Sequence, residues 1–547
     1  MKKVYLIVVF LFLLFCFAGM AEEGETFRSG DYECAVLTEN TCEITKYNGK
    51  NINIDVPEYL NGYRVVSIGD KAFYFKSDIR TIALADSIET IGNSAFYSCS
   101  ALRSVDFSDN LISIGNSAFD GCHMISKIRL PDSLKIIGDS AFSSCFDLKE
   151  IVFPNRMEKI GEKAFYHCGE IASIVFPESL ELLCDGAFAS CEKLSKVALP
   201  DGIQTVSGNP FWGCINLRSI EVSPDHKSLA VIDNVLFDKI EKKLICYPAG
   251  IKGEAYSVPR GIRAIGRSAF MYCEGLTDII IPDTVVIIEE NAFLGCSGLT
   301  AIELPESVEM IGQKAFFYMS SLLKIKLPDN VKTITGNPFG GYNPIQIDVS
   351  PDHEIFAVID GVLFNKAEKT LFFYPYWNTD ETYTVPEGTA AIGDYAFFRA
   401  SELTKIELPD SVEKIGKSAF ESCSALSSVV LPDGIKSIED SAFEDCRSIT
   451  AVNLPVSVVS IGISAFSSTG LTEIILPDEL ESIGEKAFYA CYSLREIAVP
   501  ESVVFIGKDA FSPLTMLVVA GDSYAAEYAK KNNVKYTYPD ALDWLNS

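Results

Sequence analysis

Hydrophobic residues recur along this chain in one short sequence motif. The phenylalanine of one motif is almost always 23 residues from the phenylalanine of the next. Mostly polar residues fill the gaps between the apolar positions. Around Phe142 these positions, with the glycine among them, are Leu134, Ile137, Gly138, Ala141, Cys145, Leu148, Ile151 and Phe153. The seventeen phenylalanines are Phe73, Phe96, Phe119, Phe142, Phe165, Phe188, Phe211, Phe270, Phe293, Phe316, Phe339, Phe397, Phe420, Phe443, Phe466, Phe488 and Phe511.

A unit of this length cannot bury its own apolar residues, so neighbouring units must stack and share one core. The alternation at Ile151 and Phe153 predicts a short strand with two inward side chains, and successive strands would pair in parallel. Apolar offsets of three and four between Gly138 and Cys145 predict one helical turn, with Gly138 at the bend. The sequence therefore predicts a leucine-rich repeat solenoid, a parallel β-ladder with short helical returns and about 17 regular units.

Two similar insertions, at about residues 223–258 and 350–385, interrupt the period. Asp233-Asn234 and Asp360-Gly361 lie between apolar runs and are typical of hairpin turns. We expect each insertion to be a degenerate turn of the solenoid that carries a protruding β-hairpin.

The ends of the chain differ from the repeats. Residues 1–21 combine two lysines with an apolar run and a small-residue exit, which predicts a secretory signal peptide. The bulky residue before Cys16 disfavours the alternative of a lipid anchor. We expect a strand-rich cap at 22–66, the solenoid at 67–515 and a C-terminal cap at 516–547, with a helix starting near Ser523.

Charge and hydropathy limit the partners. The formal net charge is −28, so the chain repels phosphate backbones, and we expect no nucleic acid partner. No stretch after the signal peptide is long and apolar enough to cross a membrane. We expect the mature protein to be a secreted or cell-surface monomer.

Cysteine follows the repeat. Eleven of the 16 cysteines stand three residues after a repeat phenylalanine, where other units place Met, Tyr, Ala or Thr. This indicates buried free thiols that act as small apolar groups, in preference to disulfides or metal ligands. Cys34 and Cys42, close together in the N-terminal cap, are the exception and form a possible disulfide.

Candidate chemistry is sparse. The chain has four histidines, and two of them recur in the insertions as Asp225-His226 and Asp352-His353. A turn beside Ser223 and Ser350 explains these pairs, and the alternative is an extracellular enzyme or a metal-binding protein that uses them. We expect no enzyme activity and no cofactor.

The position between the two inward strand residues must point outward, and it varies while the core repeats. Exposed apolar residues there favour an interaction surface, although β-branched residues also simply suit strands. The candidate ligand-binding face is Arg129, Val152, Val175, Ala198, Glu221, Ile280, Glu303 and Lys326.

The motif is nearly intact from Ile415 to Pro432, as Ile-Gly-x-x-Ala-Phe-x-x-Cys-x-x-Leu-x-x-Val-x-Leu-Pro, and resembles the BspA-like family of bacterial leucine-rich repeat proteins. The resemblance covers nearly all of the chain after the signal peptide. It implies a curved right-handed solenoid and adhesion to a protein ligand, either a host matrix protein or another cell-surface protein. A passive structural spacer is the remaining alternative.

Overall fold

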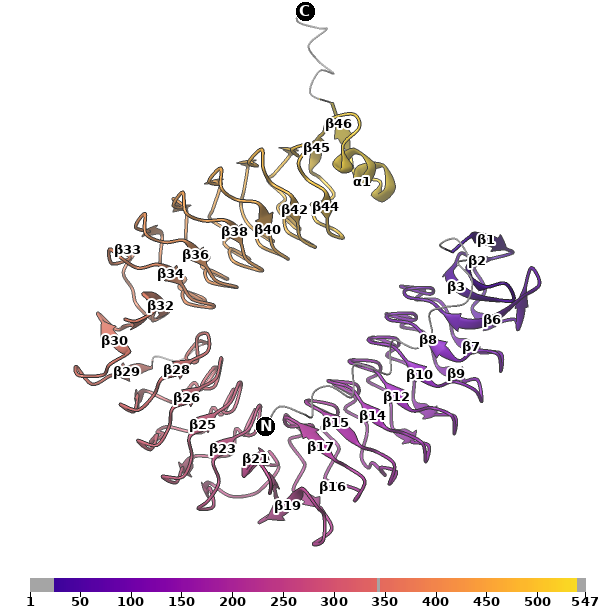
Figure 1. Ribbon diagram of the computed structural model, residues 1–547, viewed down its shortest axis with the longest axis horizontal. Helices are drawn as coiled ribbons and strands as arrows, with labels where there is room; N and C mark the ends of the chain where they lie inside the picture. The colour runs from indigo at the N-terminus through magenta and orange to yellow at the C-terminus, as the bar shows by residue number, and fades with distance from the viewer. Residues whose placement is uncertain (1–23, 342–344, 539–547) are drawn as a thin grey trace, which may run out of the picture. The chain divides into compact units, whose positions relative to one another are not determined.

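The computed structural model describes residues 24–341 and 345–538. The predicted signal peptide lies outside the described residues. The chain divides into two compact units, one of residues 1–194 and 198–210 and the other of residues 195–197 and 211–547. Both units are built from the same repeated rung (Figure 1).

Most rungs contribute two short strands, which pair in parallel with the equivalent strands of neighbouring rungs. Ladder 1, the predicted one, contains the strand with the outward residue. It comprises β4(Asn53–Asp55), β7(Thr81–Ala83), β9(Ser104–Asp106), β11(Lys127–Arg129), β13(Glu150–Val152), β16(Lys196–Ala198), β18(Ser219–Glu221), β22(Ala255–Ser257), β24(Asp278–Ile280), β27(Lys324–Lys326), β29(Gln346–Asp348), β33(Thr382–Thr384), β35(Lys405–Glu407), β37(Ser428–Val429), β39(Ala451–Asn453), β41(Glu473–Ile475), β43(Glu496–Ala498) and β45(Met516–Val518).

Ladder 2 comes just before the glycine position of the repeat and was not predicted. It comprises β6(Tyr63–Ile68), β8(Thr90–Ile91), β10(Ser113–Ile114), β12(Ile136–Ile137), β14(Lys159–Ile160), β15(Leu182–Cys184), β17(Thr205–Ser207), β21(Lys243–Cys246), β23(Ala264–Ile265), β25(Ile287–Ile288), β26(Met310–Ile311), β28(Thr333–Ile334), β32(Thr370–Phe373), β34(Ala391–Ile392), β36(Lys414–Ile415), β38(Ser437–Ile438), β40(Ser460–Ile461), β42(Ser482–Ile483) and β44(Phe505–Ile506).

Other elements stand at the two ends. At the N-terminal end β1(Thr26–Ser29), β2(Tyr32–Thr38) and β3(Thr41–Tyr47) form an antiparallel meander, and β3 joins ladder 2 by pairing in parallel with β6; β5(Tyr59–Leu60) also pairs with β6. At the other end α1(Tyr524–Asn532) precedes β46(Tyr536–Thr537), which pairs with β45. The expected cap residue Ser523 accepts a hydrogen bond from the N–H of Ala526, as an N-cap does.

The return between the ladders is not the single helical turn that we predicted. Ser140, Phe142 and Ser144 donate their N–H groups to carbonyl oxygens of the next rung at 2.7–2.8 Å. Ser140 and Ser144 have φ of 54° and 57°, which is left-handed backbone. A helix would use these N–H groups within its own segment, whereas here they bond to the neighbouring rung.

Gly138 allows close packing between rungs, a role that we did not predict. A Cβ built on it would lie 2.7 Å from the backbone nitrogen of Asn116 in the preceding rung. In this part of the solenoid the residue after the glycine continues a hydrogen-bond chain, since Asn116 Oδ1 accepts the N–H of Asp139 at 2.8 Å and Asp139 Oδ1 accepts that of Glu162 at 2.9 Å. Rungs are therefore joined along the return as well as along the two ladders.

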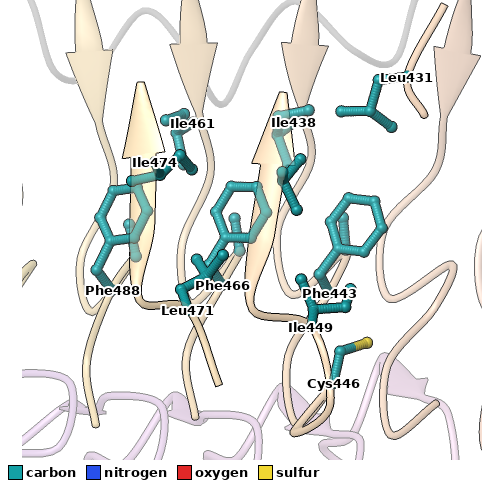
Figure 2. Packing of buried hydrophobic residues seen from close by; sticks show 14 of the residues in the cluster. Leu431, Ile438, Phe443, Cys446, Ile449, Ile461, Phe466, Leu471, Ile474 and Phe488 are labelled. Carbon is teal, nitrogen blue, oxygen red and sulfur yellow. The ribbon is translucent and has the colours of Figure 1, made fainter. Parts of the chain in front are cut away.

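The repeat phenylalanines form the centre of the core. They stack face to face between successive rungs, for example Phe443 on Phe466 with ring centroids 5.4 Å apart and Phe466 on Phe488 at 5.5 Å. Figure 2 shows this column with Ile438, Ile461 and the thiol of Cys446 around it. Each buried ring thus contacts its neighbours in the adjacent rungs, as stacking of incomplete units requires.

The insertions contain the predicted hairpins, and both hairpins are joined to ladder 2. In the first, β19(Leu229–Ile232) pairs antiparallel with β20(Val235–Asp238), and β20 with β21. In the second, β30(Phe356–Ile359) pairs with β31(Val362–Asn365), and β31 with β32. β21 and β32 then pair in parallel with β23 and β34 of ladder 2, so each hairpin extends the ladder.

In the second hairpin sheet, β31 and β32 are buried on both faces. Val362, Phe364 and Leu371 belong to the core that follows the insertion. Leu363, Phe372 and Phe373 belong to the core that precedes it. A sheet covered on both faces favours continuous apolar runs over alternation, so the sheet is a partition between two cores.

We predict that Gly138→Ala lowers the thermal midpoint, because the new methyl group would overlap the backbone of Asn116; overpacking of this kind costs about 1–3 kcal/mol. Gly169→Ala is the matched control, since a Cβ there meets nothing within 4 Å. Circular dichroism melts of both variants provide the measurement. Equal midpoints for the two variants would contradict the close-packing role of Gly138.

Candidate functional site

All eight residues of the predicted ligand-binding face are exposed. Arg129, Val152, Val175 and Ala198 belong to the first unit, and Glu221, Ile280, Glu303 and Lys326 belong to the second. The structure places Arg129 directly opposite Val152 in the β11–β13 pair. Val175 and Glu303 keep the repeat position but lie outside assigned strands.

The apolar members of this row are unusually open to solvent. Val175 is 83% exposed, Val152 51% and Ile280 60%, while the inward residue Ile151 is 8% exposed. The alternation of inward and outward side chains is therefore confirmed, and a binding role for the outward ones stays a prediction.

A second apolar set in the same row was missing from the predicted face. Val430 is 77% exposed and Ile475 80%. Asn453 lies between them, bridged to Val430 and paired with Ile475. The outward position in the sequence could have identified this set, but the polar residue in the middle hid its continuity.

Ion pairs run beside the outward row. The first residue of each ladder 1 strand faces the same side as the third, and Lys127 contacts Glu150 at 2.8 Å. In the second unit Lys405 contacts Glu407 at 2.7 Å, and the hydrogen bond from Lys405 lowers the pKa of the Glu407 carboxyl. Exposed pairs of this kind add little stability, but they neutralise the charge next to the apolar positions.

The two Asp-His pairs build turns. His226 is 2% exposed, and its Nδ1 accepts the N–H groups of Ser228 and Leu229 at 3.2 and 3.0 Å. His353 repeats this arrangement with Ile355 and Phe356, while Asp225 and Asp352 are exposed. Within residues 24–341 and 345–538 no three metal-ligating side chains gather.

Fifteen cysteines of the described residues are free and buried, which confirms the prediction for the repeat cysteines. Most of the repeat cysteines also donate a hydrogen bond to the carbonyl of the repeat phenylalanine one rung back, as Cys145 does to Phe119 at 3.5 Å and Cys168 to Phe142 at 3.2 Å. Sequence reasoning treated them as apolar groups and missed this donor role.

Cys34 and Cys42 are also free thiols, and they hydrogen-bond to each other. They are diagonal neighbours across β2 and β3, where Cys34 pairs with Ile44 and Cys42 with Val36. The structure therefore does not contain the possible disulfide, and its formation stays a prediction.

Comparisons with known proteins agree with this repeat. A family description, the BspA type leucine rich repeat region in 6 copies, matches residues 66–194, 158–252, 246–360 and 390–517. No curated protein matches the chain.

Several solved structures resemble this chain. A leucine rich cell surface protein of Faecalibacterium prausnitzii is 23% identical, and the match covers 94% of this chain and 98% of that one with a TM-score of 0.33. A Treponema pallidum leucine rich repeat protein is 32% identical over 35% of this chain and 91% of its own, with a TM-score of 0.32. A Bacteroides ovatus protein is 22% identical over 92% and 100%, with a TM-score of 0.31.

Because its thiols are buried, we predict that the folded protein becomes less stable at alkaline pH. Burial raises the pKa of Cys99 from 9.0 to about 12 and that of Cys145 well above 9.0. Above pH 9 the unfolded chain ionises its thiols and the folded chain does not, so the free energy of unfolding falls as pH rises from about 9 towards 12. Urea midpoints between pH 7 and 11 measure this fall.

The control is a triple variant, Cys99→Ala, Cys122→Ala and Cys145→Ala. Buried tyrosines also titrate in this range, for example Tyr32, whose pKa burial raises to about 12. The triple variant should therefore lose less stability per pH unit without becoming insensitive. Identical slopes for the two proteins would show that the thiols contribute nothing.

Proposed function

Because the chain belongs to the BspA-type leucine-rich repeat family, we propose that it is a secreted or surface-exposed protein that binds protein ligands and catalyses no reaction. The ligand class is a host matrix protein or another cell-surface protein. The observation that carries the proposal is a fixed buried core beside an outward row that varies from rung to rung and leaves Val175 83% exposed.

Shape and chemistry support binding on this row. Its outward apolar side chains stand beside exposed ion pairs, an arrangement close to the apolar centre and polar rim of protein interfaces. Apolar side chains that open to solvent gain the most from being covered by a partner. No helix among the described residues is long and apolar enough to span a membrane.

We predict that Val175→Asp, alone or with Val152→Asp, weakens binding to a matrix or cell-surface protein by about tenfold, because a charge replaces an apolar contact. Surface plasmon resonance over a panel of purified proteins would identify the ligand and then measure its affinity. Val504→Asp is the control, since Val504 is 66% exposed but stands outside the row. Unchanged affinity in the Val175 variant would reject this surface.

Secretion has its own test. If residues 1–21 are a cleaved signal peptide, the protein in the culture medium should begin at residue 22. Intact-mass measurement of the secreted chain decides this, and peptide mapping of the unreduced chain shows whether Cys34 and Cys42 are joined. A chain that keeps residue 1 and stays inside the cell would contradict the proposed location.

A further inference from the structure

The two insertions are internal copies that differ at one informative position. From Ser223 and Ser350 onward they align at a constant offset, and both contain a Tyr-Pro pair, at Tyr247 and Tyr374. Three residues after these tyrosines the first copy has Gly250 and the second has Trp377. This difference changes how the loop lies against ladder 1.

In the first copy the loop lies tightly against the chain that leads into β18. Gly250 donates its N–H to the carbonyl of Leu217 at 2.8 Å. A Cβ on Gly250 would lie 2.6 Å from that same oxygen, so no larger residue fits there. Trp377 cannot reproduce this approach in the second copy.

In the second copy a hollow separates the loop from ladder 1. Its volume is about 610 Å³ where β29 faces residues 377–380. Among the described residues no hydrogen bond joins β29 to this loop. The hollow has the size of ordinary ligand pockets.

One wall of this hollow is an open sheet edge. β29 pairs with β27 alone, in a sheet of two strands. Gln346 donates its N–H to Leu323, and Asp348 accepts from Leu327, both towards β27 at 2.8 Å. Since alternate residues of a parallel strand bond to opposite sides, the N–H and C=O of Ile347 point into the hollow, and they have no partner among the described residues.

The rim of the hollow carries uncompensated negative charge. Asp360 and Asp380 line it, both are exposed, and neither forms an ion pair among the described residues. A second hollow of about 430 Å³ shares Gln346, Ile347 and Val358 with the first. The charges there are already paired, Lys326 with Glu306 at 2.8 Å and Lys324 with Asp348 at 2.5 Å.

We propose that the hollow between β29 and residues 377–380, called the groove below, binds an extended peptide segment of a partner protein. The segment contains lysine or arginine and adds as a strand to the free edge of β29. Ile347 supplies the backbone hydrogen bonds, in the manner of strand addition at an exposed edge. Trp377 offers an aromatic face to a basic side chain, and Asp360 and Asp380 supply the opposite charge. The groove uses the edge of ladder 1, so it stands independently of the outward row proposed above.

The test uses the full chain and a defined probe, a capped hexapeptide of alternating valine and lysine with a fluorescent label. Fluorescence polarisation should show saturable binding. A peptide of the same sequence, N-methylated on the residues that face one side, should bind at least about tenfold more weakly, because it cannot donate to the edge. A peptide with glutamate in place of lysine should not bind.

Protein variants localise the effect. The double variant Asp360→Asn with Asp380→Asn should bind the lysine peptide about tenfold more weakly. Asp233→Asn, at the matched position of the first insertion, should leave the affinity unchanged. Trp377→Gly should also weaken binding, and a thermal melt checks its folding. The aspartate variant does not touch the core, so it keeps the proposal testable if Trp377→Gly unfolds.

Three outcomes overturn the proposal. The first is no saturable binding of the lysine peptide, and the second is equal binding of the N-methylated peptide. The third is saturable binding of a soluble oligosaccharide that the Trp377 variant loses while the peptide does not bind, which would assign the groove to carbohydrate. Loss of ligand binding in the Val175 variants leaves all three results unaffected.

Discussion

The fold depends on hydrogen bonds between rungs. Where a helix satisfies its N–H groups within its own segment, Phe142 donates to Ala164 in the next rung, and Asp139 takes the N–H of Glu162 with its side chain. Two strand ladders, the return and the stacked phenylalanines all join the same pairs of neighbours. A rung without a neighbour would leave these polar groups unsatisfied, which is why the chain needs repetition.

The sequence predicted what the period encodes. The 23-residue spacing indicated stacked rungs, and the alternation at Ile151 and Val152 indicated an inward and an outward row. Ladder 2 was missed because a strand such as β14 has two residues, too few to show alternation. The return was misread because apolar offsets of three and four suit both a helix and a chain of turns, and only left-handed backbone at Ser140 and Ser144 separates them.

The insertions mark the limit of local patterns. Their turns, at Asp233-Asn234 and Asp360-Gly361, followed from residue type, and the structure has φ of 51° and 65° at the first pair. The burial of the hairpins could not be predicted from the sequence, because an apolar run does not indicate whether one core or two cores cover it. The edge of β29 was likewise invisible, since it depends on how far the loop with Trp377 stands from the strand.

The partition formed by β31 and β32 has a consequence for the length of the molecule. With Leu363 in one core and Val362 in the other, each core ends on a finished wall and not on an open rung. The first insertion supplies Val235 and Phe237 to the far end of the same preceding core. A block bounded by such walls is a self-terminated module, so gene duplication or deletion could lengthen or shorten the protein without leaving an apolar end bare.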